Sequence, residues 1–207
     1  MKRKSLNMLW GCLASALPLC SAAVTPTTIQ LIDPLDDARG WCVDLFGDLA
    51  GALPLGGLRG HNCLLYLGRG PTEDQGFDAE PIEDRGEFRL IHFDLCMTLH
   101  EPNPGSFVPV EPCGDGKTQD FEMTADGRIV PLMAPRLCLT LGATTVPGGD
   151  RLAPAGSEAS SNDDISQVRR LTFETCSEDD RELSARQRWR LADTHEQRAP
   201  TRERRFQ

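Results

Sequence analysis

The amino-acid sequence predicts an all-β domain built from three degenerate repeats. Three observations support this fold class. A strand-like pattern centred on a cysteine occurs three times, a glutamine followed two residues later by an aromatic residue also occurs three times, and the two patterns alternate along the chain. The composition, with 19 glycines and 15 prolines in 207 residues, is typical of a protein with many turns and short strands.

The amino terminus predicts export. The first four residues carry three positive charges, a mainly apolar stretch follows, and Ser21 and Ala23 fit the small-residue positions of a signal peptidase site. We therefore expect a secretory signal peptide at 1–23, cleavage after Ala23, and a secreted or periplasmic location. The apolar stretch is shorter than the roughly 20 residues that a spanning helix needs. Lipoprotein attachment through Cys20 is a minor alternative, because Leu19 is larger than the residue that normally precedes a lipidated cysteine.

The exported chain is strongly acidic. The formal net charge of the sequence is −9, and loss of the three basic residues of the leader lowers it to −12. Such a surface repels nucleic-acid phosphates and anionic lipids, so we expect neither as a partner. Removal of the leader leaves 184 residues, which fit one domain with some excess of loop.

Six cysteines remain beyond the leader, at positions Cys42, Cys63, Cys96, Cys113, Cys138 and Cys176. An even number of cysteines in an exported chain predicts three disulfides. Zinc binding is the alternative, and it is disfavoured because no two of these cysteines have the C-x-x-C spacing. The count alone allows fifteen pairings. We expect no metal and no cofactor.

Each repeat contains a five-residue pattern of apolar residue, Cys, apolar residue, polar residue and Leu. It occupies residues 41–45, 95–99 and 137–141, and its alternation predicts a half-buried strand. A β-rich run precedes each copy and a second cysteine follows it. Beyond that cysteine come the glutamine and aromatic pairs Gln75 and Phe77, Gln119 and Phe121, and Gln187 and Trp189. Residues i and i+2 share a face of a strand, so each glutamine needs backbone partners to be buried beside its aromatic residue.

These residues resemble the ricin B-type lectin family, whose repeats carry a Cys-apolar-Asp strand, a second cysteine and a closing Q-x-W. The resemblance covers about residues 29–191. It implies a β-trefoil, in which three four-stranded repeats pack around a pseudo-threefold axis. It also implies one disulfide within each repeat, namely Cys42–Cys63, Cys96–Cys113 and Cys138–Cys176.

The three repeats differ in length. A Gly- and Leu-rich segment at 47–60 lengthens the first, and a run rich in Ala, Gly, Ser and Pro lengthens the third. After residue 191 the chain is polar and basic, which predicts disorder. The expected parts are a trefoil domain at 28–191 with repeats at about 28–86, 87–127 and 128–191, an exposed insertion at 143–170, and a disordered basic tail at 192–207.

The resemblance also implies a sugar pocket in each repeat. In the family, each pocket uses an Asp two residues after the first cysteine and a stacking residue two residues before the second cysteine. It also uses an amide at or beside the closing glutamine. The first repeat matches this set in part, and its expected ligand-binding residues are Asp44, His61, Asn62, Asp74 and Gln75. The corresponding residues are Thr98, Glu111 and Thr118 in the second repeat, and Thr140, Glu174 and Arg186 in the third. We therefore expect at most one intact pocket, in the first repeat.

Several of these residues also have a structural interpretation. Asp44 can cap a turn in its own hairpin, and the three glutamines can hold the closing strand of each repeat. No catalytic motif such as G-x-S-x-G or H-E-x-x-H occurs, and the four histidines lack metal-ligand spacing.

We expect a non-enzymatic module that binds a carbohydrate or glycoconjugate. One alternative is a trefoil that binds another protein through its loops, as a protease inhibitor does, after its sugar pockets have degenerated. Another is a cell-envelope protein with a structural role.

Overall fold

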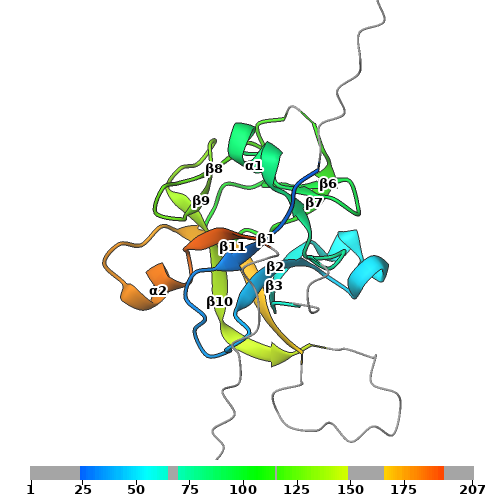
Figure 1. The fold of residues 1–207 in the computed structure, drawn as a ribbon. Coiled ribbons are helices and arrows are strands. Elements are labelled where there is room, and N and C mark those ends of the chain that lie inside the picture. Colours follow the sequence, from blue (N-terminus) through cyan, green and yellow to red (C-terminus); the bar gives the residue numbers. More distant parts are fainter. Residues whose placement is uncertain (1–23, 65–69, 115, 149–165, 194–207) are drawn as a thin grey trace, which may run out of the picture.

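The computed structural model describes residues 24–64, 70–114, 116–148 and 166–193 (Figure 1). The expected signal peptide and residues 194–207 of the expected tail lie outside this part. The strands of the first repeat are β1 (Pro26–Leu31), β2 (Trp41–Leu45), β3 (Leu58–Asn62) and β4 (Phe77–Asp78). Those of the second are β5 (Arg89–Leu90), β6 (Leu95–Met97), β7 (Val110–Pro112) and β8 (Phe121–Met123). Those of the third are β9 (Ile129–Pro131), β10 (Leu137–Pro147), β11 (Gln167–Thr175) and β12 (Trp189–Asp193).

Helical structure in the described residues is limited to short segments. The α-helices are α1 (Ala79–Arg85) and α2 (Arg181–Ala185), and two 3-10 turns are η1 (Leu49–Gly51) and η2 (Pro54–Gly56). The Asp180 carboxylate caps α2 by accepting hydrogen bonds from the backbone N–H groups of Glu182 and Leu183. None of these described helices has the length and hydropathy to cross a bilayer.

Strands β12, β1, β4 and β5 pair in one sheet and β8 and β9 in a second, and single backbone hydrogen bonds connect the two sheets. The first strand of each repeat pairs with the last strand of the preceding one, through the residue pairs Leu31 and Trp189, Leu90 and Phe77, and Pro131 and Phe121. In the first repeat β1 also pairs with β4 through Thr27 and Phe77. In the other two repeats the contact is made just before the first strand, where Phe121 N–H donates to Gly86 O and Trp189 N–H donates to Gly127 O. The other six strands form the hairpins β2–β3, β6–β7 and β10–β11. This arrangement is a β-trefoil, which confirms the predicted fold class.

Two glycines allow these close backbone contacts. Gly86 and Gly127 have φ angles of +68° and +87°, in the left-handed region that favours glycine. A Cβ atom on Gly86 would lie 1.7 Å from Phe121 O, and one on Gly127 would lie 2.6 Å from Trp189 O. Any larger residue would therefore separate the strands at these two junctions.

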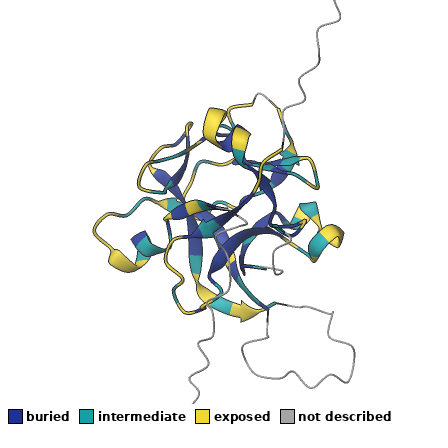
Figure 2. Cartoon of the chain, in the orientation of Figure 1, coloured by how far each residue is buried: buried dark blue, intermediate teal, exposed yellow. Residues whose placement is uncertain are grey.

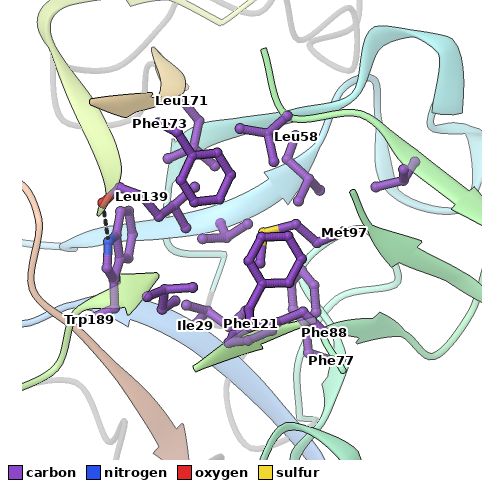
Figure 3. Close-up of a cluster of buried hydrophobic side chains, with 14 of the residues drawn as sticks. Ile29, Leu58, Phe77, Phe88, Met97, Phe121, Leu139, Leu171, Phe173 and Trp189 are labelled. Atoms are coloured by element: carbon purple, nitrogen blue, oxygen red, sulfur yellow. Dashed lines mark hydrogen bonds between the residues drawn. The ribbon is translucent and has the colours of Figure 1, made fainter. Parts of the chain in front are cut away.

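The aromatic residues of the repeated motif are buried together in one core (Figures 2 and 3). The rings of Phe121 and Phe173 stack at a centroid distance of 5.7 Å, and Phe88 meets Phe121 edge-on at 5.9 Å. The Trp189 indole N–H donates to Leu139 O at 3.0 Å, so this polar group is satisfied within the core. All three repeats thus contribute to a shared apolar interior.

Each repeat contains its own disulfide. The bonds join Cys42 to Cys63, Cys96 to Cys113, and Cys138 to Cys176. This confirms the pairing that the resemblance implied. Three disulfides also fit an oxidising compartment.

The third repeat differs from the expectation at two places. Strands β10 and β11 enter the segment 143–170 from both sides, and Ser166 and Arg169 are buried there rather than exposed. The reason is that β11 pairs with β3 of the first repeat as well as with β10. The middle of the insertion, 149–165, lies outside the described residues. Strand β12 also includes Ala192 and Asp193, the first two residues of the expected tail, because they pair with Thr28 and Thr27.

Candidate functional site

The three glutamines make the same set of hydrogen bonds. Each amide nitrogen donates to the side chain two residues after the first cysteine and to a backbone carbonyl, and each amide oxygen accepts from the N–H of the residue after the second cysteine. For Gln187 the partners are Thr140 Oγ1 at 2.9 Å, Thr175 O at 3.0 Å and Ser177 N at 2.9 Å. For Gln75 they are Asp44 Oδ2, Asn62 O and Leu64 N, and for Gln119 they are Thr98 Oγ1, Pro112 O and Gly114 N. The glutamines therefore fasten each hairpin to its closing strand.

The five residues expected to bind ligand in the first repeat lie together and are buried. Asp44, His61, Asn62, Asp74 and Gln75 are each at most 2 % exposed. The Asp44 carboxylate accepts from Gln75 and is ion-paired with Arg59, whose Nε lies 2.6 Å from Asp44 Oδ1. The Arg59 guanidinium also donates to Gly47 O. The side chain of Arg59 therefore occupies the space over Asp44.

The other three residues of this set are also bonded to protein groups. His61 Nε2 lies 2.5 Å from Ser166 Oγ, and Asn62 Oδ1 accepts from the backbone N–H of Gln167 at 2.8 Å. The Asp74 carboxylate accepts from Thr72 Oγ1 and from the N–H of Leu49, each at 2.7 Å. In this arrangement the expected ligand-binding atoms face the interior of the protein.

Asp44 titrates far from the usual range of an aspartate. Burial raises the pKa of Asp44 to about 7, with Asp74 adding to the rise and Arg59 opposing it. The desolvation of the carboxylate thus outweighs its attraction to one guanidinium. The pair is consequently sensitive to pH near neutrality.

The hairpin of the third repeat covers the first repeat. In the pairing of β11 with β3, Val168 is opposite His61 and Arg169 is opposite Gly60. The Arg169 guanidinium lies 4.6 Å from the centre of the Trp41 ring and donates to both carboxylate oxygens of Asp36 at 2.7 Å. These contacts join residues that are more than 100 positions apart in the sequence.

In the second repeat a threonine replaces the aspartate. The Thr98 hydroxyl is buried, donates to Cys96 O and accepts from Gln119. The side chains of Glu111 and His100 form an exposed pair, with Oε1 and Nε2 at 2.8 Å. Thr118, at the amide position, is partly buried.

The third repeat contains a hollow of about 400 Å³ at the position that the resemblance gives to a sugar pocket. Its lining residues are Thr140, Gly142, Ala143, Arg170, Thr172, Glu174, Thr175, Leu183 and Arg186. It lies between the β10–β11 hairpin and α2, which stand side by side in Figure 1. The predicted residues Thr140, Glu174 and Arg186 are therefore brought together here.

A comparison of matched positions explains why the hollow occurs in this repeat. Thr140 pairs with Thr172 across the third hairpin, as Asp44 pairs with Arg59 across the first. In the first repeat the long arginine side chain fills the space. Two threonines leave that space open in the third. The ladder between β10 and β11 is also broken between Leu141 and Thr145. Gly142 lies at this break and has no side chain, so the hollow is wider there.

Polar groups converge on the hollow from two sides. Thr172 Oγ1 donates to Glu174 Oε1 at 2.9 Å, and Arg186 Nη1 donates to Leu141 O at 3.1 Å. Arg186 Nε is buried and has no hydrogen-bond partner among the described residues. Leu183 supplies an apolar wall. The hollow therefore offers a carboxylate, hydroxyls, a guanidinium and an apolar contact.

Sequence reasoning did not identify Arg170 and Thr172 as part of this site. They alternate with the buried residues Leu171 and Phe173, so that Arg170, Thr172 and Glu174 share the outer face of β11. This alternation is visible in the sequence. It was missed because the low-complexity composition of the preceding segment suggested an insertion that extended to residue 170.

A larger hollow of about 680 Å³ lies between α1 and β8. Apolar residues including Ile82, Met123 and Leu191 form much of its lining. Arg85, one of its charged residues, is already paired with Glu87 at 2.8 Å. No residue at a pocket position of any repeat lines this hollow, whereas Thr140, Glu174 and Arg186 line the third-repeat hollow, which is therefore the better candidate site.

No family model matches the sequence, and no curated protein matches it. Similar solved structures include an agglutinin from Abrus precatorius, with a TM-score of 0.49 and 18 % identity over 84 % of this chain and 51 % of that chain. The β-trefoil lectin of the Vibrio vulnificus hemolysin/cytolysin, with N-acetyl-D-lactosamine bound, gives 0.47 and 15 % over 82 % and 95 %. The mdaA-1 domain in solution gives 0.49 and 13 % over 83 % and 91 %.

The chain spans about half the length of the agglutinin chain that it matches. The fold itself is evident from the chain's own geometry. The twelve strands of the described residues form three copies, and each copy has one disulfide and the same glutamine contacts, so the fold is a β-trefoil.

Proposed function

We propose that the protein is a secreted or periplasmic carbohydrate-binding module without catalytic activity, and that the third-repeat hollow is its sugar site. Export through the leader at 1–23, with cleavage after Ala23, is part of this proposal. The observation that carries the sugar site is the open space between Thr140 and Thr172, with Glu174 and Arg186 beside it.

The chemistry of the hollow suits a sugar. Adjacent sugar hydroxyls need a carboxylate or amide that can accept more than one hydrogen bond, and a pyranose face needs an apolar contact. Glu174 supplies the first and Leu183 the second. The hydroxyl groups of Thr140 and Thr172 donate to Cys138 O and Glu174, and their oxygens add acceptors at the base. A volume of about 400 Å³ lies within the range of small-molecule sites.

We infer that the five buried residues of the first repeat stabilise the fold while Arg59 and β11 cover them. Ligand contact by Asp44, His61, Asn62, Asp74 or Gln75 requires Arg59 and β11 to move away from them. The direct test is therefore to compare sugar binding by variants of the first repeat with binding by variants of the third repeat.

A glycan array with the protein lacking residues 1–23 tests this function. Thr172→Arg introduces an arginine at the position of Arg59, which fills the corresponding space in the first repeat. We therefore expect this variant to lose sugar binding. Asp44→Asn, which keeps the shape of the first-repeat side chain, should leave binding within about twofold. Loss of binding in Asp44→Asn but not in Thr172→Arg would place the sugar in the first repeat. An array without any saturable binding would contradict the carbohydrate function.

A second candidate function is binding to another protein. Four large apolar side chains, those of Phe46, Leu53, Leu55 and Phe107, are 45 %, 59 %, 100 % and 46 % exposed. The Phe46 ring lies against Gly56 and the Phe107 ring lies against Gly57, so these two rings are neighbours. Exposed apolar groups of this kind favour a protein partner. Sugar binding that Leu55→Ser leaves unchanged would separate the sugar site from this surface.

A further inference from the structure

We propose that the third-repeat hollow selects an anionic sugar, one that carries a carboxylate or a sulfate group. This inference rests on the proposed carbohydrate function and specifies the class of ligand. It depends on the charges of Arg170, Arg186 and Glu174, all of which line the hollow.

The hollow is locally positive on an acidic protein. Two guanidinium groups and one carboxylate line it, whereas the whole sequence has a formal net charge of −9. The matched residues of the first repeat are Gly57 and Asp74, and those of the second are Phe107 and Thr118. The pair of arginines is thus specific to the repeat that has the open space.

The charge of Arg186 is only weakly neutralised within the protein. Its nearest carboxylate in the described part of the chain is that of Glu182, where Nη2 and Oε1 are 3.7 Å apart and the Glu182 side chain is 78 % exposed. Its Nε–H is buried without a partner among the described residues. An unpaired buried donor is unfavourable, so an anionic oxygen of a ligand that reached this N–H group would be favoured.

Arg170 provides a second cationic group at the outer edge. Its side chain is exposed and forms no ion pair with the residues that the structure describes. Glu174 is engaged by the Thr172 hydroxyl rather than by either arginine. Apart from the bond of Arg186 to Leu141 O, both guanidinium groups therefore keep N–H donors for a carboxylate or sulfate oxygen.

The overall negative charge does not prevent this binding. Screening reduces the interaction of exposed charges beyond about 8 Å at physiological ionic strength. Hydrogen-bonded contact with a guanidinium occurs at about 3 Å and keeps most of its strength. Local attraction therefore outweighs long-range repulsion at physiological ionic strength.

Glu174 gives the site its requirement for a sugar rather than for any anion. Its carboxylate accepts hydrogen bonds from hydroxyl groups but repels a second negative charge. Glu174→Gln should therefore strengthen the binding of a simple anion such as sulfate, and it should weaken the preference for a hydroxylated ligand.

Isothermal titration calorimetry with four probes tests the inference. The probes are digalacturonate, its methyl ester, a neutral galactose disaccharide and a sulfated disaccharide. We expect the protein to bind digalacturonate, the sulfated disaccharide or both, and to bind the neutral probes at least about tenfold more weakly, which corresponds to one charged hydrogen bond. The stronger of the two anionic probes identifies the group that the site prefers.

Matched arginine variants identify the residues responsible. Arg186→Gln should lower the affinity for the anionic probe about tenfold or more, and Arg170→Gln, which is exposed, about threefold. Arg188→Gln removes an exposed arginine of the same repeat that does not line the hollow, and should have no effect. Thermal unfolding of each variant checks its folding, and the exposed Arg170 variant tests the site even if Arg186→Gln is unstable.

The outcomes separate the inference from the proposed function. Equal binding of charged and neutral disaccharides that Thr172→Arg abolishes would overturn the anionic preference but retain the sugar site. Binding that neither Arg170→Gln nor Arg186→Gln changes would also overturn it. No binding of any probe, together with a silent glycan array, would overturn the carbohydrate function itself.

Discussion

The residue two positions after the first cysteine determines the character of each repeat. Asp44, Thr98 and Thr140 occupy this position, and each accepts a hydrogen bond from its closing glutamine. A carboxylate at this position attracts Arg59 and the space is filled. A hydroxyl does not, and in the third repeat the space stays open. Two residues, Thr140 and Thr172 in place of Asp44 and Arg59, thus distinguish the candidate site from the packed hairpin.

The repeated glutamine is a testable residue-scale feature. Gln187→Leu should lower the free energy of unfolding by about 2 to 3 kcal/mol, because it removes the bonds to Thr140 Oγ1 and Thr175 O and leaves the N–H of Ser177 without its acceptor. Urea denaturation measures the change. Gln167→Leu is the control, since no side-chain hydrogen bond forms at that position in the described residues, and it should change stability by less than about 0.5 kcal/mol.

Asp44 predicts a pH dependence of stability. Its pKa of about 7 in the folded state exceeds the value of about 3.9 in the unfolded chain, so the folded state holds the proton more tightly. The contribution of this group to stability therefore falls as the pH rises from 4 to 7. Between pH 5 and pH 8 the wild-type protein should lose about 2 to 3 kcal/mol relative to Asp44→Asn.

Chemical denaturation of both proteins at several pH values measures this difference. Asp44→Asn also leaves Arg59 without its carboxylate, which adds a penalty that is the same at every pH in this range. Parallel stability profiles for the two proteins would contradict the prediction.

At the scale of elements, the β10–β11 hairpin shows where sequence reasoning was insufficient. The pattern at residues 137–141 predicted the start of β10 correctly. The alternation at the end of β11 is visible in the sequence, but the composition of the preceding residues hid its start, which pairs with β3 more than 100 residues earlier. The partners of Arg169 in the first repeat were likewise invisible to a local pattern.

Arg169 should contribute strongly to the attachment of this hairpin. Arg169→Met removes hydrogen bonds to Asp36, Thr145 and Gly142, and uncovers one face of Trp41. We expect a loss of about 2 to 4 kcal/mol in unfolding free energy, together with stronger acrylamide quenching of tryptophan fluorescence. Arg170→Met, at the adjacent exposed position, is the control and should change neither measurement appreciably.

At the scale of the whole molecule, the repeat made the fold predictable. Cysteines, glutamines and aromatic residues in one frame defined three equivalent units, and the resemblance that they carried gave the disulfide pairing. The open site was not predictable in this way. It depends on the volume between two side chains across a hairpin, and a sequence motif records which residues are present but not which space they leave empty.

The disulfides should stabilise the whole chain according to the loops that they close. The sequence separations are 17 residues for Cys96–Cys113 and 38 for Cys138–Cys176. In the chain-entropy model their removal costs about 3 and about 4 kcal/mol respectively. Paired alanine variants compared by denaturation measure this order, and non-reducing peptide mapping should recover only bonds within repeats. A bond between repeats would contradict the architecture.

The position of the two arginines in a single repeat has a consequence for how the protein meets a polysaccharide. A ligand site whose charges have no counterpart in the other two repeats occurs once per chain. A monomer would then decorate a polymer surface without cross-linking it. Strong attachment would have to come from avidity, with several copies or a linked domain engaging neighbouring sugars at once.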